Sequence, residues 1–379
     1  MEKFWIEFNE IFKQHGDAAA RSGKRISFGT HHIRRGYLRR DFHLLRGGGL
    51  LRLEHGQVVR ERRFKLGSPY NLKAKHIRAL IDDWLARRHS QSYLENKLSV
   101  WRQFCAWINK PNLVPGTAEV MSCPNYRHRS QVAVIDKTWS GRGIDVPGKL
   151  REIASNDARV ALVLELMLTF SLRLKEASLL RPHAADQGAY LDVCRGTKGR
   201  RQRVHPIATT EEREVIERAK ALVADRTACL VPRGKTYKQW QNHVYYVLTR
   251  HGISHKQIGT STHGLRHQGL NRLYEQITGA RSPVRGGRPG EVDRATDRFA
   301  RQQVAETAGH GKRSVSSAYL GGVLHGRQPS AAIPNPPSAS GDGEEGGDEG
   351  DDEDEDYDDY LRRLITALRD RISSDEAIS

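Results

Sequence analysis

Four separated segments of the chain contain side chains that could act on a phosphate group. Arginine and lysine bind phosphate oxygens through charge and hydrogen bonds, histidine accepts or donates a proton near neutral pH, and a tyrosine hydroxyl can attack phosphorus. The segments are FSLRLKEASLL, GTKGRRQRV, STHGLRHQ and AGHGKRSVSSAYLG, and their candidates are Arg173, Lys198, His263, Arg266, His310 and Tyr319. Any one segment is weak evidence, but four in this order, with His310 nine residues before Tyr319, indicate a shared site.

Together the four segments resemble the tyrosine recombinase (phage integrase) family. The resemblance covers roughly residues 68–324, because YLENKLSVWRQFCAWINKPNLV is similar to the core-binding domain of integrases from mobile genomic islands. It implies a mostly α chain, with an all-α core-binding domain before an α+β catalytic domain that has a small β-hairpin. It also implies a site-specific recombinase that cleaves and rejoins double-stranded DNA, for integration or excision of a mobile element. Such enzymes act as a homotetramer on DNA, with a possible accessory DNA-bending protein.

The resemblance assigns roles to four of the candidates. Tyr319 is the nucleophile that forms a 3′-phosphotyrosine ester. Arg173 and Arg266 match the family's two arginines, which stabilise the charge that develops on the non-bridging phosphate oxygens. Arginine does not release a proton near neutral pH, so Lys198 is expected to protonate the departing 5′ oxygen, with its pKa lowered by neighbouring cations.

The remaining candidates are histidines and one glutamate. His263 lies one helical turn before the second arginine, where it could accept the tyrosine proton or donate to the phosphate. His310 is expected to donate a second hydrogen bond to the phosphate. Glu176 could orient the first arginine through an ion pair, and His267 is expected to support the site without direct participation. The reaction conserves the energy of the phosphate ester, so no metal or cofactor is expected.

Several alternatives are open at this stage. His263 and His267 have a spacing that could ligate zinc, but no third ligand is nearby in the sequence. The stretch GIDVPGK at 143–149 has the spacing of a phosphate-binding loop, but Leu150 stands where such a loop needs Ser or Thr. A type IB-like topoisomerase would use the same residues, and a non-catalytic architectural protein would use only the DNA-binding surface.

The charge of the chain supports a polyanionic partner. The 379 residues include 62 Lys and Arg against 45 Asp and Glu, a net charge of +17. From Asp342 onward there are 16 acidic and 4 basic residues, a net charge of −12, so residues 1–341 carry +29. The predicted DNA contacts are basic residues on two helices and a hairpin, namely Lys73, Lys75, Arg78, Arg88, Lys97, Arg102, Arg195, Arg200, Arg201 and Arg203.

The elements that must position these residues follow from apolar spacing. Apolar residues at helical spacing predict helices over 77–85, 94–108, 160–170, 210–224, 237–250, 263–277 and 297–307. The stretches AYLDVCR and QRVHPI, joined by GTKGRR, predict a β-hairpin. The stretch TGARSPVRGGRPGEVD lengthens the distance from Arg266 to His310 beyond the family's usual spacing, and it predicts an inserted basic loop over 278–296.

These patterns divide the chain into six predicted regions. They are a basic N-terminal arm (1–66), a helical core-binding domain (67–125), a linker (126–145), a catalytic domain (146–327), a disordered acidic tether (328–357) and an amphipathic C-terminal helix (358–379). The C-terminal helix is expected to make tail contacts between protomers. No stretch approaches the roughly 20 apolar residues that span a bilayer, and no signal-peptide core follows Met1. The four cysteines form no C-x-x-C pair. We therefore expect a cytoplasmic protein, nucleoid-associated when bound to DNA and without a membrane partner.

Overall fold

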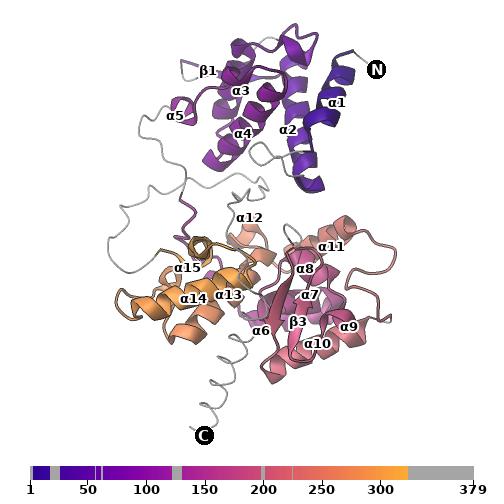
Figure 1. The fold of residues 1–379 in the computed structure, drawn as a ribbon, viewed down its shortest axis with the longest axis vertical. Helices are drawn as coiled ribbons and strands as arrows, with labels where there is room; N and C mark the ends of the chain where they lie inside the picture. Colours follow the sequence, from indigo (N-terminus) through magenta and orange to yellow (C-terminus); the bar gives the residue numbers. More distant parts are fainter. Residues whose placement is uncertain are drawn as a thin grey trace. The chain divides into compact units, whose positions relative to one another are not determined.

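The computed structural model describes residues 3–17, 26–55, 57–60, 63–121, 130–197, 201–223 and 225–322. They form two compact units, shown in Figure 1: an N-terminal unit up to Ser130 and a C-terminal unit from Gln131 onward. The predicted acidic tether and C-terminal helix lie outside the described residues. Within the described part, no helix is both long and apolar enough to span a membrane.

The N-terminal unit is a helical bundle with a small hairpin. Its main helices are α1 (Lys3–His15), α2 (Phe28–Gly47), α3 (Ala74–Ala86) and α4 (Gln91–Trp107), with the short α5 (Thr117–Val120) at its end. Strands β1 (Leu51–Glu54) and β2 (Gln57–Arg60) pair antiparallel. Serine side chains cap α2 and α4 by accepting a hydrogen bond from a first-turn backbone N–H. The predicted helices over 77–85 and 94–108 are present as α3 and α4.

The prediction of a separate basic arm over residues 1–66 is wrong. Phe8 of α1 and Phe42 of α2 are fully buried, and they pack in one hydrophobic core with Leu80 of α3 and Phe104 of α4. The Phe8 and Phe42 rings lie edge to face with their centroids 5.7 Å apart. Apolar residues at helical spacing in KFWIEFNEIF contained the signal for this packing, which the high density of cations after residue 20 obscured.

Two predicted DNA contacts of the N-terminal unit are instead structural. Lys97 is fully buried, and its Nζ lies 2.6 and 2.7 Å from the two carboxylate oxygens of Asp41, which also accepts a hydrogen bond from Trp101 Nε1 at 2.7 Å. Arg102 is half-buried and donates to Pro115 O at 2.7 Å and to Thr117 Oγ1 at 3.0 Å. A buried ammonium is stable only when it is paired, so Lys97 supports this core.

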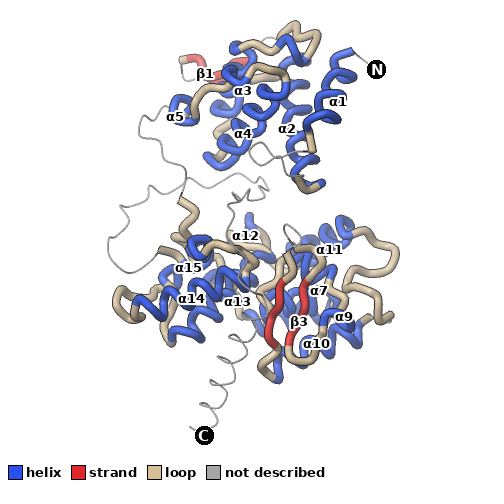
Figure 2. The backbone as a smooth tube through the Cα atoms, in the orientation of Figure 1, coloured by secondary structure: helices blue, strands red, loops and turns tan. Residues whose placement is uncertain are grey.

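The C-terminal unit packs helices around a two-stranded sheet, drawn red in Figure 2. In chain order it contains α6 (Val146–Asn156), α7 (Ala158–Thr169), α8 (Leu174–Leu179), α9 (Pro182–Ala185), β3 (Tyr190–Val193), β4 (Arg203–Pro206), α10 (Thr210–Leu222), α11 (Tyr237–Arg250), α12 (His255–Ile258), α13 (Thr262–Thr278), α14 (Arg294–Thr307) and α15 (Ser317–Leu320). The strands are antiparallel, with Tyr190 opposite Pro206. The hairpin and helices α7, α10, α11, α13 and α14 therefore form where the sequence predicts them, whereas α6 was not predicted.

Helix α7 is the centre of the C-terminal core. Its side chains are apolar on nearly every face, and Val160, Val163, Leu164 and Leu166 are fully buried. Helix α13 packs against α7 at a close approach, because a Cβ added at Gly269 would lie only 2.5 Å from Leu168 O. Helix α13 contains three of the candidate residues, His263, Arg266 and His267, so this contact fixes their helix on the core.

The predicted linker is wrong after residue 130. Residues 131–145 belong to the C-terminal unit, where the Trp139 side chain is fully buried and its Nε1 donates to Ser261 O at 2.8 Å. Nearby, the Ala133 backbone N–H donates to Ser317 O at 2.8 Å. The weak apolar periodicity and the glycines of this stretch indicated a loop, but they did not indicate whether the loop packs on a domain.

Candidate active site

The Arg266 side chain is held rigidly at the base of the site. It lies on α13, is fully buried, and donates from Nη1 to Ser171 O at 2.5 Å and from Nη2 to Ala308 O at 2.6 Å. One accepting carbonyl lies in the loop before α8, and the other lies at the end of α14. Burial lowers the pKa of Arg266, yet the guanidinium stays charged because arginine deprotonates only far above neutral pH.

Arg173 converges on the same carbonyl from the start of α8. Its Nη2 donates to Ala308 O at 3.1 Å and its Nη1 donates to Glu176 Oε1 at 2.8 Å. The backbone N–H of Arg173 donates to the second Glu176 oxygen at 2.7 Å, which caps the helix. The two arginines predicted to bind one phosphate therefore share one backbone acceptor, although 93 positions separate them in the sequence.

Glu176 organises the cations from within the protein, not at its surface. The carboxylate is fully buried and contacts three guanidiniums, those of Arg173, Arg203 and Arg266. Burial alone would raise the pKa of Glu176, but Arg203, Arg266 and Arg173 together lower it below its ordinary value. The carboxylate is therefore ionised near neutral pH and orients the arginines.

Arg203 is not the exposed DNA contact that the sequence predicted. Its side chain is 5% exposed, forms an ion pair with Glu176 and donates from Nη1 to Thr307 O at 2.7 Å. Gly309 has a φ of 73°, and a Cβ there would lie 2.6 Å from Arg203 Cδ, so Arg203 packs beneath the residue before His310. The basic composition of the hairpin concealed that this cation points inward.

Tyr319 lies inside this group of side chains. It is on the single turn α15, is 5% exposed, and its hydroxyl is 3.2 Å from His310 Nε2. The guanidinium carbon of Arg266 is 5.8 Å from the centroid of the tyrosine ring. The predicted nucleophile, one predicted histidine and one predicted arginine are thus adjacent.

The two histidines of α13 also face the tyrosine. The ring centroid of His267 lies 4.9 Å from that of Tyr319, and the centroid of His263 lies 6.3 Å away. His263 keeps an exposed edge, but crowding by the surrounding protein limits its hydration, and with the charges of Arg266 and Arg173 this lowers its pKa. Burial, His263 and Lys137 hold the pKa of His267 well below its usual range. Both imidazoles are therefore neutral near neutral pH.

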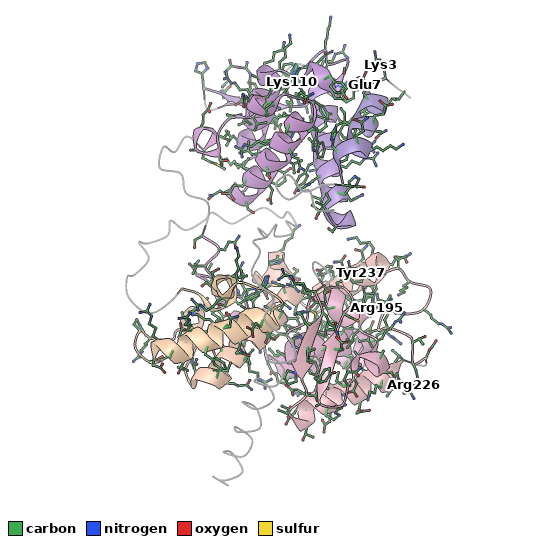
Figure 3. All side chains as sticks on the ribbon, viewed as in Figure 1. Lys3, Glu7, Lys110, Arg195, Arg226 and Tyr237 are labelled. Atoms are coloured by element: carbon green, nitrogen blue, oxygen red, sulfur yellow. The ribbon has the colours of Figure 1, made fainter. Side chains whose placement is uncertain are left out.

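The tip of the β3–β4 hairpin contains Lys198 and Arg200, which lie outside the described residues. The flanks of the tip are described, and Arg195 and Arg201 are exposed there; Figure 3 labels Arg195. Gly196 has a φ of 77°, and a Cβ there would lie 2.8 Å from Lys175 O. The hairpin thus leaves the sheet directly beside α8, the helix that Arg173 caps at its N-terminus.

The exposed cations of the N-terminal unit form a separate set. Lys73, Lys75 and Arg78 are exposed at the start of α3, and Arg88 is exposed just after α3 ends at Ala86. These four predicted DNA contacts are accessible to a ligand, unlike Lys97.

One residue beside the tyrosine was not predicted. Asn271 is fully buried on α13, and its Nδ2 donates to His267 O at 2.7 Å and to Tyr319 O at 3.2 Å. It lies one helical turn after His267, so a polar residue on the same face as a candidate histidine was the available signal.

Comparison with known proteins identifies the fold. No protein-family model matches the sequence, and no curated protein matches it significantly. A solved structure of a lambda integrase (75–356) dimer bound to a COC′ core site is similar, with a TM-score of 0.52 and 12% identity over 86% of this chain and 98% of that one. The Tn1549 transposon integrase (aa 82–397) with circular intermediate DNA aligns at 13% identity over 84% and 95%, with a TM-score of 0.48. XerA recombinase aligns at 16% identity over 83% and 94%, with a TM-score of 0.33. The chain has the fold of lambda integrase, and the predicted mostly helical class with a small antiparallel sheet is confirmed.

Proposed function

We propose that this protein is a site-specific DNA recombinase that cleaves and rejoins strands through a 3′-phosphotyrosine at Tyr319. The observation that supports this most strongly is the 3.2 Å contact between the Tyr319 hydroxyl and His310 Nε2, beside two arginines that share Ala308 O. A buried tyrosine needs no such surroundings for packing alone. The lambda integrase of the same fold is described bound to a DNA core site, which is consistent with DNA as the substrate.

In the cleavage step, Tyr319 Oη attacks the scissile phosphorus and forms a P–O bond. The bond from phosphorus to the 5′ oxygen breaks, and that oxygen takes a proton from Lys198. The tyrosine proton passes to a neutral imidazole, for which His310 Nε2 is within hydrogen-bond distance and His263 faces the same ring. Rejoining reverses these transfers with a 5′-hydroxyl of another strand, so the ester energy is retained.

The arginines act on the phosphate oxygens. Three guanidiniums around one carboxylate leave an excess of two positive charges, and a phosphate whose charge increases during attack complements that excess. Carbonyls already fix Arg266 and Arg173, so little reorganisation accompanies the reaction. This arrangement supports the proposal that positioning and charge, not a bound metal, stabilise the transition state.

We propose that exposed cations bind the DNA backbone outside the site. In the N-terminal unit these are Lys73, Lys75, Arg78 and Arg88, and in the hairpin they are Arg195 and Arg201. The sequence prediction adds Arg200, which lies outside the described residues. Each phosphate contact should contribute about −0.9 to the slope of log affinity against log salt. Replacing Lys75 and Arg78 with Gln should therefore make that slope shallower by about 2, and an unchanged slope would exclude them.

The acidic tail of the sequence supports a further part of the proposal. The segment 358–379 makes contacts between protomers in an assembly on DNA, and the net charge of −12 over residues 342–379 competes with DNA for basic surfaces. Truncation after Arg327 should then alter assembly on DNA or raise non-specific DNA affinity. Unchanged assembly together with unchanged affinity would contradict this role.

A nicked suicide substrate tests the central proposal. Once the strand is cut, a short 5′ fragment diffuses away, so a covalent adduct accumulates and resists denaturing electrophoresis. We expect the wild-type chain to form the adduct and Tyr319→Phe to form none while it still binds the DNA. A wild-type chain without an adduct, or an adduct that persists in Tyr319→Phe, would contradict the assignment. Relaxation of plasmids that lack a cognate site would favour a topoisomerase instead.

A further inference from the structure

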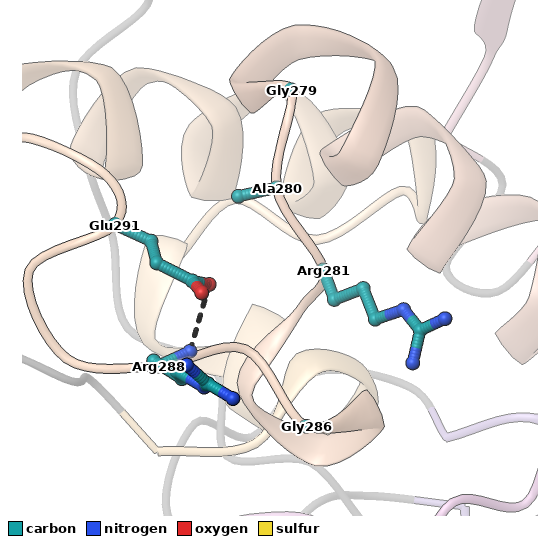
Figure 4. A pocket seen from close by; sticks show the side chains of 6 residues that line it. All are labelled: Gly279, Ala280, Arg281, Gly286, Arg288 and Glu291. Atoms are coloured by element: carbon teal, nitrogen blue, oxygen red, sulfur yellow. Dashed lines mark hydrogen bonds between the residues drawn. The ribbon is translucent and has the colours of Figure 1, made fainter.

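The loop between α13 and α14 makes ordered contacts with the helix that contains Tyr319. Its first part contains a short 3-10 turn, Pro283–Arg285, and its second part closes where the Arg288 backbone N–H donates to Glu291 Oε2 at 2.9 Å. Figure 4 shows the hydrogen bond between Arg288 and Glu291, together with Arg281, which lines the same pocket. Both arginines are exposed, but the residue between Arg281 and Pro283 is fully buried.

That buried residue, Ser282, connects the loop to the backbone of the tyrosine. Its Oγ donates to Asn271 Oδ1 at 2.5 Å. The amide nitrogen of Asn271 donates to Tyr319 O at 3.2 Å and to His267 O at 2.7 Å. Because Asn271 uses its nitrogen for two carbonyls, its oxygen needs a donor, and Ser282 supplies it. A continuous chain of hydrogen bonds thus runs from the loop to Tyr319 and to the neighbouring histidine.

A second contact lies two residues after the tyrosine. Gly321 has a φ of 85°, and a Cβ there would lie 2.9 Å from the backbone nitrogen of Val284 and 3.2 Å from Ala133 O. The carbonyl of Gly321 also accepts a hydrogen bond from Arg301 Nη1 at 3.1 Å. The loop therefore packs directly against the chain where α15 ends, and only glycine fits the space.

A third contact links the loop to the segment that contains Ala133 and Asp136, which is bonded to the start of α15. Arg285 Nη1 lies 2.8 Å from Glu275 Oε2 on α13, and its Nε lies 3.6 Å from Asp136 Oδ2. Asp136 is three residues after Ala133, whose backbone N–H donates to Ser317 O in α15. The start of α15 is thus bonded to the segment that Arg285 contacts, and the end of α15 packs against the loop itself.

We propose that the segment Arg281–Arg285, named here the Ser282 loop, is a positioning element for the Tyr319 hydroxyl, acting through Asn271 and Gly321. Helix α15 has only four residues, and an isolated turn of helix does not hold its own geometry. Its position therefore depends on the contacts that surround it. This inference rests on the proposed function, and it assigns to the loop a role that its basic composition does not suggest.

Single-turnover cleavage of the suicide substrate at saturating DNA tests the proposal. Misplacement of a reacting group by a fraction of an ångström slows a reaction strongly, so Ser282→Ala should lower the cleavage rate about tenfold. Its DNA affinity should stay within about twofold, because no DNA-contacting charge is removed. The matched control is Arg288→Gln, which removes an exposed charge that follows the Ser282 loop and should leave the saturated cleavage rate unchanged.

A second substrate separates the nucleophile from the leaving group. When sulfur replaces the bridging 5′ oxygen, the leaving group needs no proton, so a defect in proton donation disappears while a misplaced tyrosine stays slow. The Ser282→Ala defect should therefore persist with the sulfur substrate. Disappearance of the defect, or a Ser282→Ala rate equal to that of the wild type with the ordinary substrate, would overturn the inference.

Two further outcomes are separable. If the wild-type chain forms no adduct, the proposed function fails, whereas an adduct formed equally by both chains overturns only the role of the loop. If Ser282→Ala does not fold, Arg285→Gln decides, because its partly exposed ion pairs contribute little to stability. That variant should cleave about threefold more slowly at unchanged DNA affinity, and an unchanged rate would overturn the inference.

Discussion

Each unit buries a cluster of charged side chains, and the two clusters differ in their balance. In the N-terminal unit one cation, Lys97, meets one anion, Asp41, and the pair is fully enclosed. In the C-terminal unit three guanidiniums meet the single carboxylate of Glu176, and backbone carbonyls accept the remaining hydrogen bonds. A balanced buried pair serves the fold, whereas an unbalanced one beside Tyr319 leaves positive charge for a phosphate.

The largest expected effect tests the balanced cluster. Replacing Lys97 with Met leaves the Asp41 carboxylate buried without its partner, which should destabilise the N-terminal unit by about 3–5 kcal/mol. Chemical denaturation measures the change, and the exposed Lys75→Met is the matched control. Equal, small losses in both variants would show that Lys97 is not the buried partner described here.

The next effect tests the unbalanced cluster. Arg266→Lys keeps the charge but loses the two fixed donors to Ser171 O and Ala308 O, so the remaining cation is no longer aimed at the phosphate. We expect the single-turnover cleavage rate to fall about 10²–10³-fold, with DNA binding retained. A rate near that of the wild type would mean that charge alone suffices and that the fixed geometry is unimportant.

A smaller effect concerns pH. Because the pKa of folded Glu176 lies below its ordinary value of 4.5, ionisation of this carboxyl stabilises the fold above that value. The contribution is lost as the pH falls toward the lowered pKa. The unfolding temperature of the C-terminal unit should therefore fall steeply below about pH 4.5. The Glu176→Gln variant should be less stable at neutral pH, but its unfolding temperature should fall less as the pH is lowered. Parallel curves for the two chains would contradict the assignment.

The sequence predicts much of this fold, because apolar spacing is a local property. Helices α3, α4 and α11 lie where their apolar residues recur at helical spacing, and the hairpin lies between its two apolar strands. The direction of individual cations is not local. Lys97 finds Asp41 across 56 positions, and Arg203 finds Thr307 across 104. Composition alone therefore placed both on a DNA surface.

In the candidate site, too, the sequence predicts what depends on residue type and order, but not what depends on contacts between distant residues. Residue types and their order in the sequence predict Arg173, Arg266, His310 and Tyr319 as site residues. The sequence does not predict Asn271 or Ser282, because a neutral polar residue acquires a role only through its neighbours in the fold. Asn271 donates to the backbone of Tyr319, and Ser282 is connected to Tyr319 only through Asn271, once the loop after α13 folds back.

Identification of the residue bonded to DNA tests the central claim most directly. Trypsin cleaves after Arg313 and Arg327, and the peptide between them, SVSSAYLGGVLHGR, contains a single tyrosine. Mass spectrometry of the trapped adduct, after nuclease digestion, should find the added nucleotide phosphate on this peptide and on Tyr319 within it. A nucleotide on any other residue, or an adduct that leaves this peptide unmodified, would contradict the account.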